Sequence, residues 1–176
     1  GSLPLLSTLY LQSNSLTTLP DTLSGLTSLV YLYLNSNQVT SLPASFGSLK
    51  SLYYANLQYN NLTNLPDTLN LTSLYTLYLG YNHLTSLPPT IGRSQVLRSL
   101  SLVGNPMLSV LRDTWDALDS LYSLDLTYCP SLHTLPQSFG GMKLSTLYLS
   151  YSGFTVMQDS IGNMQTLATM KMDNTQ

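Results

Sequence analysis

The sequence contains no glutamate, and charged residues make up only 8% of its 176 residues. Soluble domains ordinarily carry about 25% charged residues. The six lysines and arginines are scattered along the chain, and the formal net charge is −2. There is therefore no basic stripe that could follow a phosphate backbone, and we expect no nucleic-acid partner. Solubility must come from serine, threonine, asparagine, glutamine and tyrosine instead.

Other residue types are scarce enough to exclude further classes of protein. The one cysteine, Cys129, cannot form a disulfide within the chain. The two histidines, His83 and His133, are far apart in the sequence and do not indicate a metal site. No apolar run approaches the roughly 20 residues of a membrane-spanning helix. We therefore expect no metal, no cofactor and no membrane span. The apolar fraction of 43% is still enough for a packed core.

A repeated pattern accounts for most of the apolar residues. The frame Leu-x-x-Leu-x-Leu-x-x-Asn-x-Leu-x-x-Leu-Pro recurs along the chain, and successive units begin 22 to 24 residues apart. A period of this length predicts a solenoid, in which each unit packs only on its neighbours. The clearest copy runs from Leu74 to Pro88. Seven complete units, numbered here one to seven, begin at Leu6, Leu29, Leu52, Leu74, Leu97, Leu121 and Leu144, and a truncated unit eight begins at Leu167.

The frame resembles that of the leucine-rich repeat family, and the resemblance covers Leu3 to Met172. The Leu-Pro pairs ending at Pro43 and Pro88 are followed by Phe-Gly or Ile-Gly, which is similar to the subclass of Ras-binding and plant immune-receptor proteins. The resemblance implies an α/β solenoid. This would be a curved horseshoe segment with a parallel concave sheet of about eight short strands and short helical or irregular convex segments. We expect a single domain over residues 1–176 that is an uncapped fragment of a longer protein, because neither end shows a polar capping unit.

Each column of the frame has a predicted physical role. The leucines fill the interior, and the residues between them point outward from a short strand. The asparagine amides are expected to form a ladder between neighbouring turns. Cys129 and Ser152 stand in the same column, so Cys129 is expected to be a buried structural thiol. The hydroxyl residue two positions after each proline is expected to cap a helical turn. The apolar residue that follows it, Trp115 in unit five, is expected in the convex core.

All 13 tyrosines fall at outward positions of the strands and the turns that follow them. Antibody paratopes use tyrosine for large contact area at low entropic cost. Tyrosine is also a strong strand former that stacks across strands, so a purely structural explanation stays open. We favour binding, because the concave face is the usual ligand surface of a solenoid. The predicted ligand-binding residues are Tyr31, Tyr33, Tyr53, Tyr54, Asn56, Tyr59, Tyr75, Tyr78, Tyr81, Arg98, Tyr122, Asp125, Tyr128, Tyr148 and Tyr151.

Unit five separates two clusters of these tyrosines and is irregular. Residues 93–95, Arg-Ser-Gln, replace an expected apolar pattern, one residue is inserted after Asn105, and Pro106 breaks the loop. A local change of curvature there would seat a protrusion of a partner. A unit that has simply drifted in sequence explains the irregularity equally well.

The sequence thus predicts a non-enzymatic recognition module that binds a protein or peptide partner through its concave face. Two alternatives remain: a structural array that self-associates by stacking through its ends, and a glycan-binding surface protein. Catalysis has little support. Asp125, Cys129 and His133 are the residue types of a nucleophilic triad, but Cys129 is expected in the ladder while Asp125 points outward.

Two signals point to different compartments. Scarce charge and a hydroxyl-rich surface favour an extracellular or cell-surface protein, whereas the subclass resemblance favours the cytosol. Asn61 and Asn70 each begin a glycosylation sequon, which matters only for a secreted chain.

Overall fold

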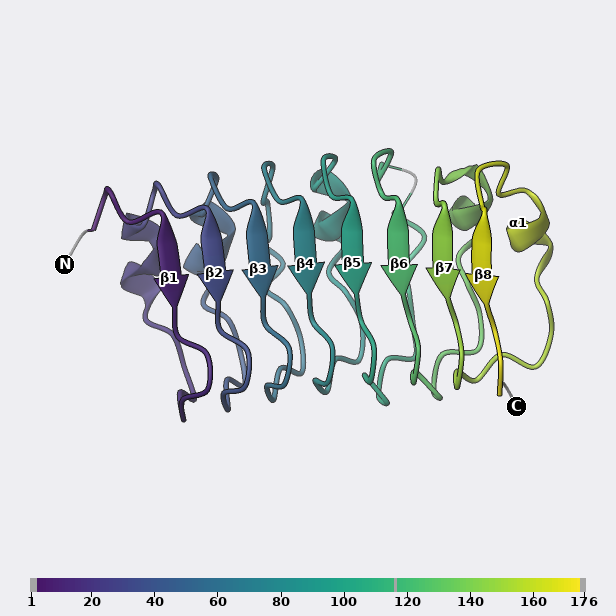
Figure 1. Cartoon of the computed structure of the whole chain (residues 1–176), viewed down its shortest axis with the longest axis horizontal. Coiled ribbons are helices and arrows are strands. Elements are labelled where there is room, and N and C mark those ends of the chain that lie inside the picture. The colour runs from purple at the N-terminus through teal and green to yellow at the C-terminus, as the bar shows by residue number, and fades with distance from the viewer. Residues whose placement is uncertain (1–2, 116, 175–176) are drawn as a thin grey trace.

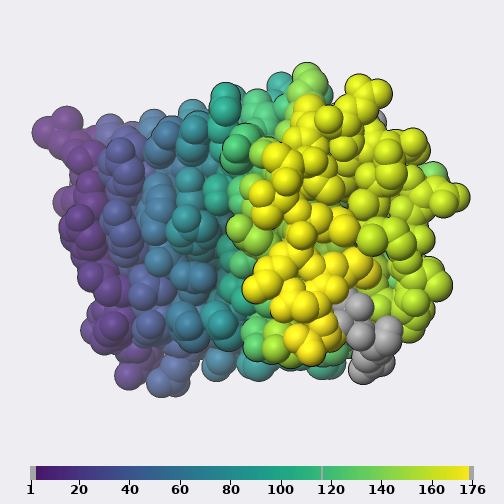
Figure 2. All heavy atoms as spheres, turned by 45° about the vertical axis from the view of Figure 1, so that its right-hand side comes forward, coloured from purple at the N-terminus to yellow at the C-terminus, as the bar shows by residue number. Residues whose placement is uncertain are grey.

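Eight short parallel strands lie side by side in the order in which they occur along the chain. The computed structural model describes residues 3–115 and 117–174. Figure 1 shows the strands as one sheet with the helical segments behind it, and Figure 2 shows successive units as successive bands of colour. The strands are β1 (Thr8–Tyr10), β2 (Tyr31–Tyr33), β3 (Tyr54–Asn56), β4 (Thr76–Tyr78), β5 (Ser99–Ser101), β6 (Ser123–Asp125), β7 (Thr146–Tyr148) and β8 (Thr169–Lys171).

The strands alternate inward and outward residues, as the leucine frame predicts. In β4 the central Leu77 is 1% exposed, while Thr76 and Tyr78 on either side are partly exposed. Each central residue pairs with the central residue of the next strand, so the leucines stack into one continuous core. Strand β5 pairs in register with both β4 and β6. The sheet therefore runs without a break through the irregular unit five.

A ladder of buried amides ties each turn to the one before it, which confirms the predicted role of the asparagine column. The Asn82 side chain is 1% exposed. Its Oδ1 accepts the Leu62 N–H at 2.9 Å, and its Nδ2 donates to the carbonyls of Leu57 and Leu79 at 3.1 and 3.0 Å. Equivalent bonds are made by Asn37, Asn60 and Asn105. Each amide thus holds its own strand, the preceding strand and the preceding loop together.

Cys129 and Ser152 continue the ladder, but each side chain only donates a hydrogen bond and accepts none. The Cys129 thiol donates to the Leu102 carbonyl at 3.5 Å, and the Ser152 hydroxyl donates to the Leu126 carbonyl at 2.8 Å. Both side chains are buried, which confirms the prediction of a structural thiol. Neither side chain makes the second contact of the asparagine amides, in which Oδ1 accepts an N–H from the preceding loop.

The loops of units five and six satisfy that N–H by themselves. In units one to four the next apolar residue follows the ladder residue by two positions, but Leu108 follows Asn105 by three and Leu132 follows Cys129 by three. The Leu108 N–H donates to the Asn105 carbonyl at 3.1 Å, and the Leu132 N–H donates to the Cys129 carbonyl at 2.9 Å. Because the inserted residue lets the loop bond this N–H itself, the next ladder position does not need an asparagine Oδ1 to accept it.

The convex segments follow the prolines. Over the residues that the structure describes, they contain four 3-10 helices and one α-helical turn: η1 (Asp21–Gly25), η2 (Ala44–Ser48), η3 (Pro89–Arg93), η4 (Gln137–Gly141) and α1 (Asp159–Gly162). In units three and five the described residues form turns in this segment. The apolar residue of the segment is buried throughout: Leu23, Phe46, Leu69, Ile91, Trp115, Phe139 and Ile161.

The prediction that hydroxyl residues cap these turns is wrong. A proline stands at the N-cap of all four 3-10 helices, and no side chain caps any of them. The hydroxyl residue lies inside the turn instead, and in unit three Thr68 donates to the Ala44 carbonyl of the preceding turn at 2.7 Å. The hydroxyls of Ser45, Thr90, Thr114, Ser138 and Ser160 are buried without a partner.

The convex core contains one polar residue at a position that is otherwise apolar. Trp115, 1% exposed, packs on Phe139 with ring centroids 5.1 Å apart, which confirms its predicted place in this core. Ser94 directly follows η3 as its C-cap, at the position held by Leu49 in unit two and Leu118 in unit five. Ser94 is 0% exposed, and its hydroxyl has no hydrogen-bond partner.

We expect Asn82→Ala to lower the free energy of unfolding by about 2 kcal/mol, because it leaves the buried Leu62 N–H without its partner and removes one of the two asparagine donors from each of the Leu57 and Leu79 carbonyls. Urea unfolding followed by circular dichroism measures this. Asn14→Ala is the matched control, since Asn14 is exposed and bonds only to carbonyls of its own turn; we expect it to cost less than about 1 kcal/mol. Equal losses in the two variants would contradict the ladder's role.

We expect Ser94→Ala to raise the free energy of unfolding by about 1 kcal/mol, because it removes a buried hydroxyl that has no partner. The same urea experiment measures the change. Ser73→Ala, at an exposed site, should leave stability within about 0.5 kcal/mol of the wild type. A destabilised Ser94→Ala would show that the hydroxyl has a partner in solution.

Candidate ligand-binding surface

The tyrosines lie on the strands, directly before them and in the turns that follow them. Figure 1 shows the sheet that these strands form, with the helical segments behind it. None of the 13 is buried. They form three sets that follow the solenoid axis. Each set also includes other residues that occupy the same positions. The entry row lies directly before the strands and contains Tyr53, Tyr75, Arg98 and Tyr122. The strand set lies on the strands and contains Tyr10, Tyr31, Tyr33, Tyr54, Asn56, Tyr78, Asp125 and Tyr148, and the turn row follows the strands and contains Tyr59, Tyr81, Gly104, Tyr128 and Tyr151.

The strand set forms a connected aromatic cluster over units one to four. The rings of Tyr10 and Tyr33 stack at 4.8 Å, those of Tyr33 and Tyr54 lie 5.1 Å apart, and Tyr78 meets Tyr54 edge to face at 5.7 Å. Tyr31 adjoins the cluster through Tyr54 at 6.4 Å. Burial, then the neighbouring Tyr78 and Tyr33, raises the pKa of the Tyr54 hydroxyl. This hydroxyl therefore remains a hydrogen-bond donor at neutral pH.

Tyr10 was not among the predicted site residues, because its unit carries only one tyrosine. It is 64% exposed and stacks face to face on Tyr33. The register of β1 with β2, which pairs Tyr10 with Tyr33, was the signal that would have found it.

The entry row adds a second aromatic stack and a cation. Tyr53 and Tyr75 stack at 4.9 Å. The Arg98 guanidinium carbon lies 5.8 Å from the centre of the Tyr75 ring, within the range of a cation–π contact. The structure thus brings Arg98 together with the tyrosines predicted beside it. Tyr122, in the same row, is half exposed.

The predicted polar residues Asn56 and Asp125 also have local structural contacts. Asn56 Oδ1 accepts the N–H of Gln58 at 3.2 Å, and Asp125 Oδ1 accepts the N–H of Thr127 at 2.9 Å. Each side chain therefore stabilises the start of the turn that leads to the turn row. Both remain partly exposed on the concave face.

The turn row has a left-handed backbone. Its non-glycine residues have φ between 54° and 57°, and Gly104 has φ of 68°. Their N–H groups continue the parallel ladder past the strands: Tyr59, Tyr81 and Tyr128 donate to carbonyls of the next unit at 2.7 to 2.9 Å. Tyr59 stacks on Tyr81 at 4.5 Å with the rings 5° from parallel, and Tyr128 stacks on Tyr151 at 4.4 Å and 10°.

A shallow hollow lies where Gly104 interrupts this row. A Cβ atom at Gly104 would come within 2.7 Å of the Tyr81 ring, so only glycine lets that ring lie over the backbone. The hollow measures about 650 Å³ and is lined by Tyr81, Gly104, Pro106, Tyr128, Pro130 and Tyr151. The sequence singled out Pro106 in the irregular unit but missed Pro130. A proline directly after two successive ladder residues was the available signal.

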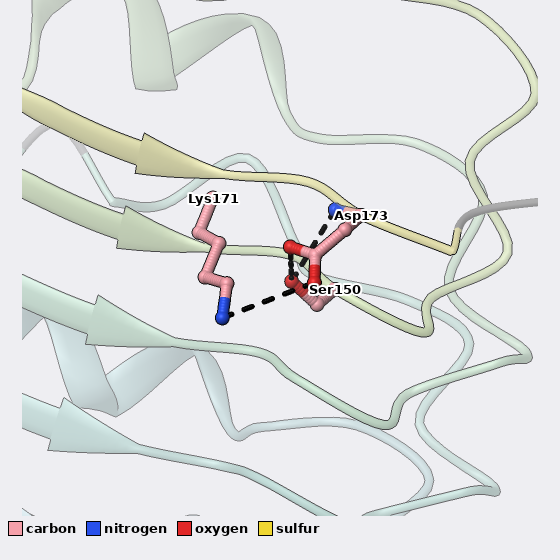
Figure 3. A network of polar contacts seen from close by, with 3 residues as sticks. All are labelled: Ser150, Lys171 and Asp173. Atoms are coloured by element: carbon pink, nitrogen blue, oxygen red, sulfur yellow. Dashed lines mark hydrogen bonds and ion pairs between the residues drawn. The ribbon is translucent and has the colours of Figure 1, made fainter.

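Unit eight replaces the aromatic surface by charge. Lys171 ends β8 at the position where β7 has Tyr148, and its ammonium lies 3.8 Å from the Asp173 carboxylate (Figure 3). The Ser150 hydroxyl donates to the same carboxylate at 2.7 Å. This hydrogen bond, more than the ammonium, lowers the pKa of Asp173. The tyrosine surface therefore ends at unit seven.

The catalytic candidates do not form a site. Cys129 is 0% exposed, and burial raises the pKa of its thiol to about 12. Asp125 uses a carboxylate oxygen to hold its own turn, and the exposed His133 has Nδ1 within hydrogen-bond distance of the Gly153 carbonyl. His83 is exposed on another loop.

In the part of the chain that the structure describes, no three His, Cys, Asp or Glu residues are placed to hold a metal ion. Over those same residues, no helix combines the length and apolarity that crossing a bilayer requires.

The sequence model of the family described as leucine rich repeat matches residues 1–39 and 72–130, more than half of the chain, and a second model of the same description matches residues 120–142. A solved leucine-rich repeat protein of Leptospira interrogans is 28% identical, with a TM-score of 0.70, over 92% of this chain and 47% of that one. An internalin of Listeria monocytogenes is 22% identical, with a TM-score of 0.65, over 97% of this chain and 55% of that one.

At 22% identity the internalin shows the fold alone. The chain spans about half the length of these two proteins. No curated protein sequence matches it.

We expect Cys129 to resist Ellman's reagent in the folded protein at about pH 8, because a thiol with a raised pKa and no exposed surface offers no thiolate. Absorbance of the released thionitrobenzoate measures this, and one thiol per chain should react in concentrated guanidinium. Rapid labelling of the folded protein would show that the ladder opens at this turn.

Proposed function

The chain belongs to the leucine-rich repeat family, and from this premise we propose that it is a non-enzymatic recognition module that binds a protein or peptide partner through its tyrosine-rich concave face. The solenoid fold supports the general class, a repeat module for protein interaction. The choice of the concave face depends on the tyrosines. The scarce charge and the hydroxyl-rich exterior support an extracellular or cell-surface setting.

The observation that carries the proposal is the left-handed backbone of the turn row. Strand propensity does not apply to Tyr59, Tyr81, Tyr128 and Tyr151, because these residues lie outside the strands at positive φ. Ser13 and Ser36 adopt the same conformation in units one and two, so this backbone does not itself require tyrosine. Stacking of the rings contributes about 0.5–1.5 kcal/mol for each pair. All four tyrosines nevertheless remain more than 40% exposed, which leaves a large aromatic surface for a partner.

The dimensions of the surface suit a macromolecular partner. Eight strands at a spacing of about 4.8 Å extend over roughly 33 Å along the solenoid axis. A standard protein interface covers about 800 Å² on each partner, which a sheet of this length can supply. Charges are few on this face, so we expect association to depend only weakly on salt.

Selection from a displayed library of random dodecapeptides tests the proposal. We expect selected peptides to bind the wild type and to lose affinity by roughly tenfold or more on the triple variant Tyr54→Ala, Tyr78→Ala, Tyr81→Ala, since aromatic contacts dominate such interfaces. Fluorescence anisotropy of the labelled peptides measures the affinity. Circular dichroism checks that the variant is folded.

The matched control carries three exposed substitutions outside the concave face: Thr27→Ala, Ser73→Ala and Gln95→Ala. It should bind the selected peptides like the wild type. Sedimentation velocity on all three proteins separates a loss of peptide binding from a change in self-association. Peptides that bind the tyrosine variant and the wild type equally would overturn the proposal, as would a selection that enriches nothing.

A further inference from the structure

We infer that the hollow beside the turn row binds a proline-rich peptide in the polyproline II conformation. This inference rests on the proposed peptide-binding function and names the class of peptide. The hollow is lined by three tyrosines, two prolines and one glycine, and none of these residues is charged. Aromatic-lined grooves of this kind bind polyproline II segments in other folds, because the ligand is already extended and loses little entropy on binding.

The spacing of the tyrosines matches the repeat of the ligand. Tyr81 and Tyr128 occupy the same column two units apart, with Gly104 between them. Two strand spacings amount to about 9.6 Å. A polyproline II helix rises about 3.1 Å per residue with three residues per turn, so prolines at positions i and i+3 are about 9.3 Å apart. The backbone spacing of Tyr81 and Tyr128 therefore matches the spacing of two such prolines.

Because Gly104 has no side chain, the Tyr81 ring lies over its backbone, and no side chain projects from this position between Tyr81 and Tyr128. Across this gap the Tyr59–Tyr81 stack ends and the Tyr128–Tyr151 stack begins. Pro106 and Pro130, each directly after a ladder residue, line the hollow with these rings. The hollow thus extends along the solenoid axis, which is the direction that the spacing argument requires.

Backbone pairing is not open to a ligand here. The N–H groups of Tyr81, Gly104 and Tyr128 already donate to carbonyls of the next unit at 2.7 to 2.9 Å. A peptide cannot add to this row as a further strand and must bind through side chains. Tyrosine hydroxyls donate hydrogen bonds, and polyproline II carbonyls accept them, since this conformation has no internal hydrogen bonds.

The charges nearby define the peptide further. Partial burial, then Tyr59 and more weakly Tyr128 and Asp125, raises the pKa of the Tyr81 hydroxyl. Like an ordinary tyrosine, it is a hydrogen-bond donor at neutral pH. Asp125 forms no ion pair with any described residue. A basic residue beside the prolines should therefore bind better than an acidic one. A glycan is less favoured, because the lining lacks the carboxylates and amides that would bind sugar hydroxyls.

The test uses fluorescein-labelled peptides of about ten residues, a length of roughly three polyproline II turns. One carries Arg followed by Pro-x-x-Pro, a second has the same composition with its prolines adjacent, and a third has Glu in place of Arg. We expect the wild type to bind the first peptide at least about fivefold more tightly than either of the others, as judged by fluorescence anisotropy.

Two variants locate the site. Tyr128→Ala should weaken the binding of the first peptide by roughly tenfold or more. Thr27→Ala, at an exposed site outside the concave face and away from the hollow, should leave it unchanged. Gly104→Ala, whose new methyl meets the Tyr81 ring, should act like Tyr128→Ala. Circular dichroism checks that each variant is folded. If Gly104→Ala does not fold, Tyr128→Ala alone tests the inference.

Three outcomes would overturn the inference. The first is no preference for the Pro-x-x-Pro spacing, and the second is equal loss on Thr27→Ala and Tyr128→Ala. The third is Tyr128-dependent binding of a glucan oligosaccharide in place of the peptide. If the dodecapeptides selected on the concave face still lose affinity on the Tyr54, Tyr78 and Tyr81 triple variant, the proposed function stands and only the choice of ligand fails.

Discussion

The buried side-chain ladder is the interaction on which the rest of the structure depends. Each ladder amide, represented by Asn82, joins two strands and one loop at a single point of every turn. It sets the register in which the central leucines stack and in which the outward residues align. Without that register the leucines would still be buried, but the outward residues would not form rows.

In a solenoid with a fixed register, the residue type at each position of the frame determines which side chains lie together on the surface. A residue type that recurs at one position of the frame becomes a continuous row on the surface, because neighbouring units place that position one strand spacing apart. Tyrosine recurs in this way before the strands, on them and after them, and the rings stack across units at 4.4 to 4.9 Å. Rows of stacked rings are pre-ordered, so a partner meets a surface that loses little entropy on binding.

The irregular loops of units five and six combine two features. The extra residue lets each loop satisfy its own N–H, which allows Cys129 and Ser152 to stand in the ladder. The same loops place Pro106 and Pro130 beside the turn row, and the hollow lies there. A departure from the repeat that keeps the sheet in register thus changes the surface locally without disturbing the core.

The sequence by itself determined the architecture, because the strands, the ladder, the buried Cys129 and the convex Trp115 follow from the chemistry of each column of the frame. It also placed every tyrosine on the outward side. It did not show that prolines, rather than the convex hydroxyl residues, occupy the N-cap positions of the 3-10 helices, since helix ends depend on backbone angles. Only the tertiary structure decided the left-handed turn row and the hollow at Gly104, because both arise from the alignment of neighbouring turns rather than from any single turn.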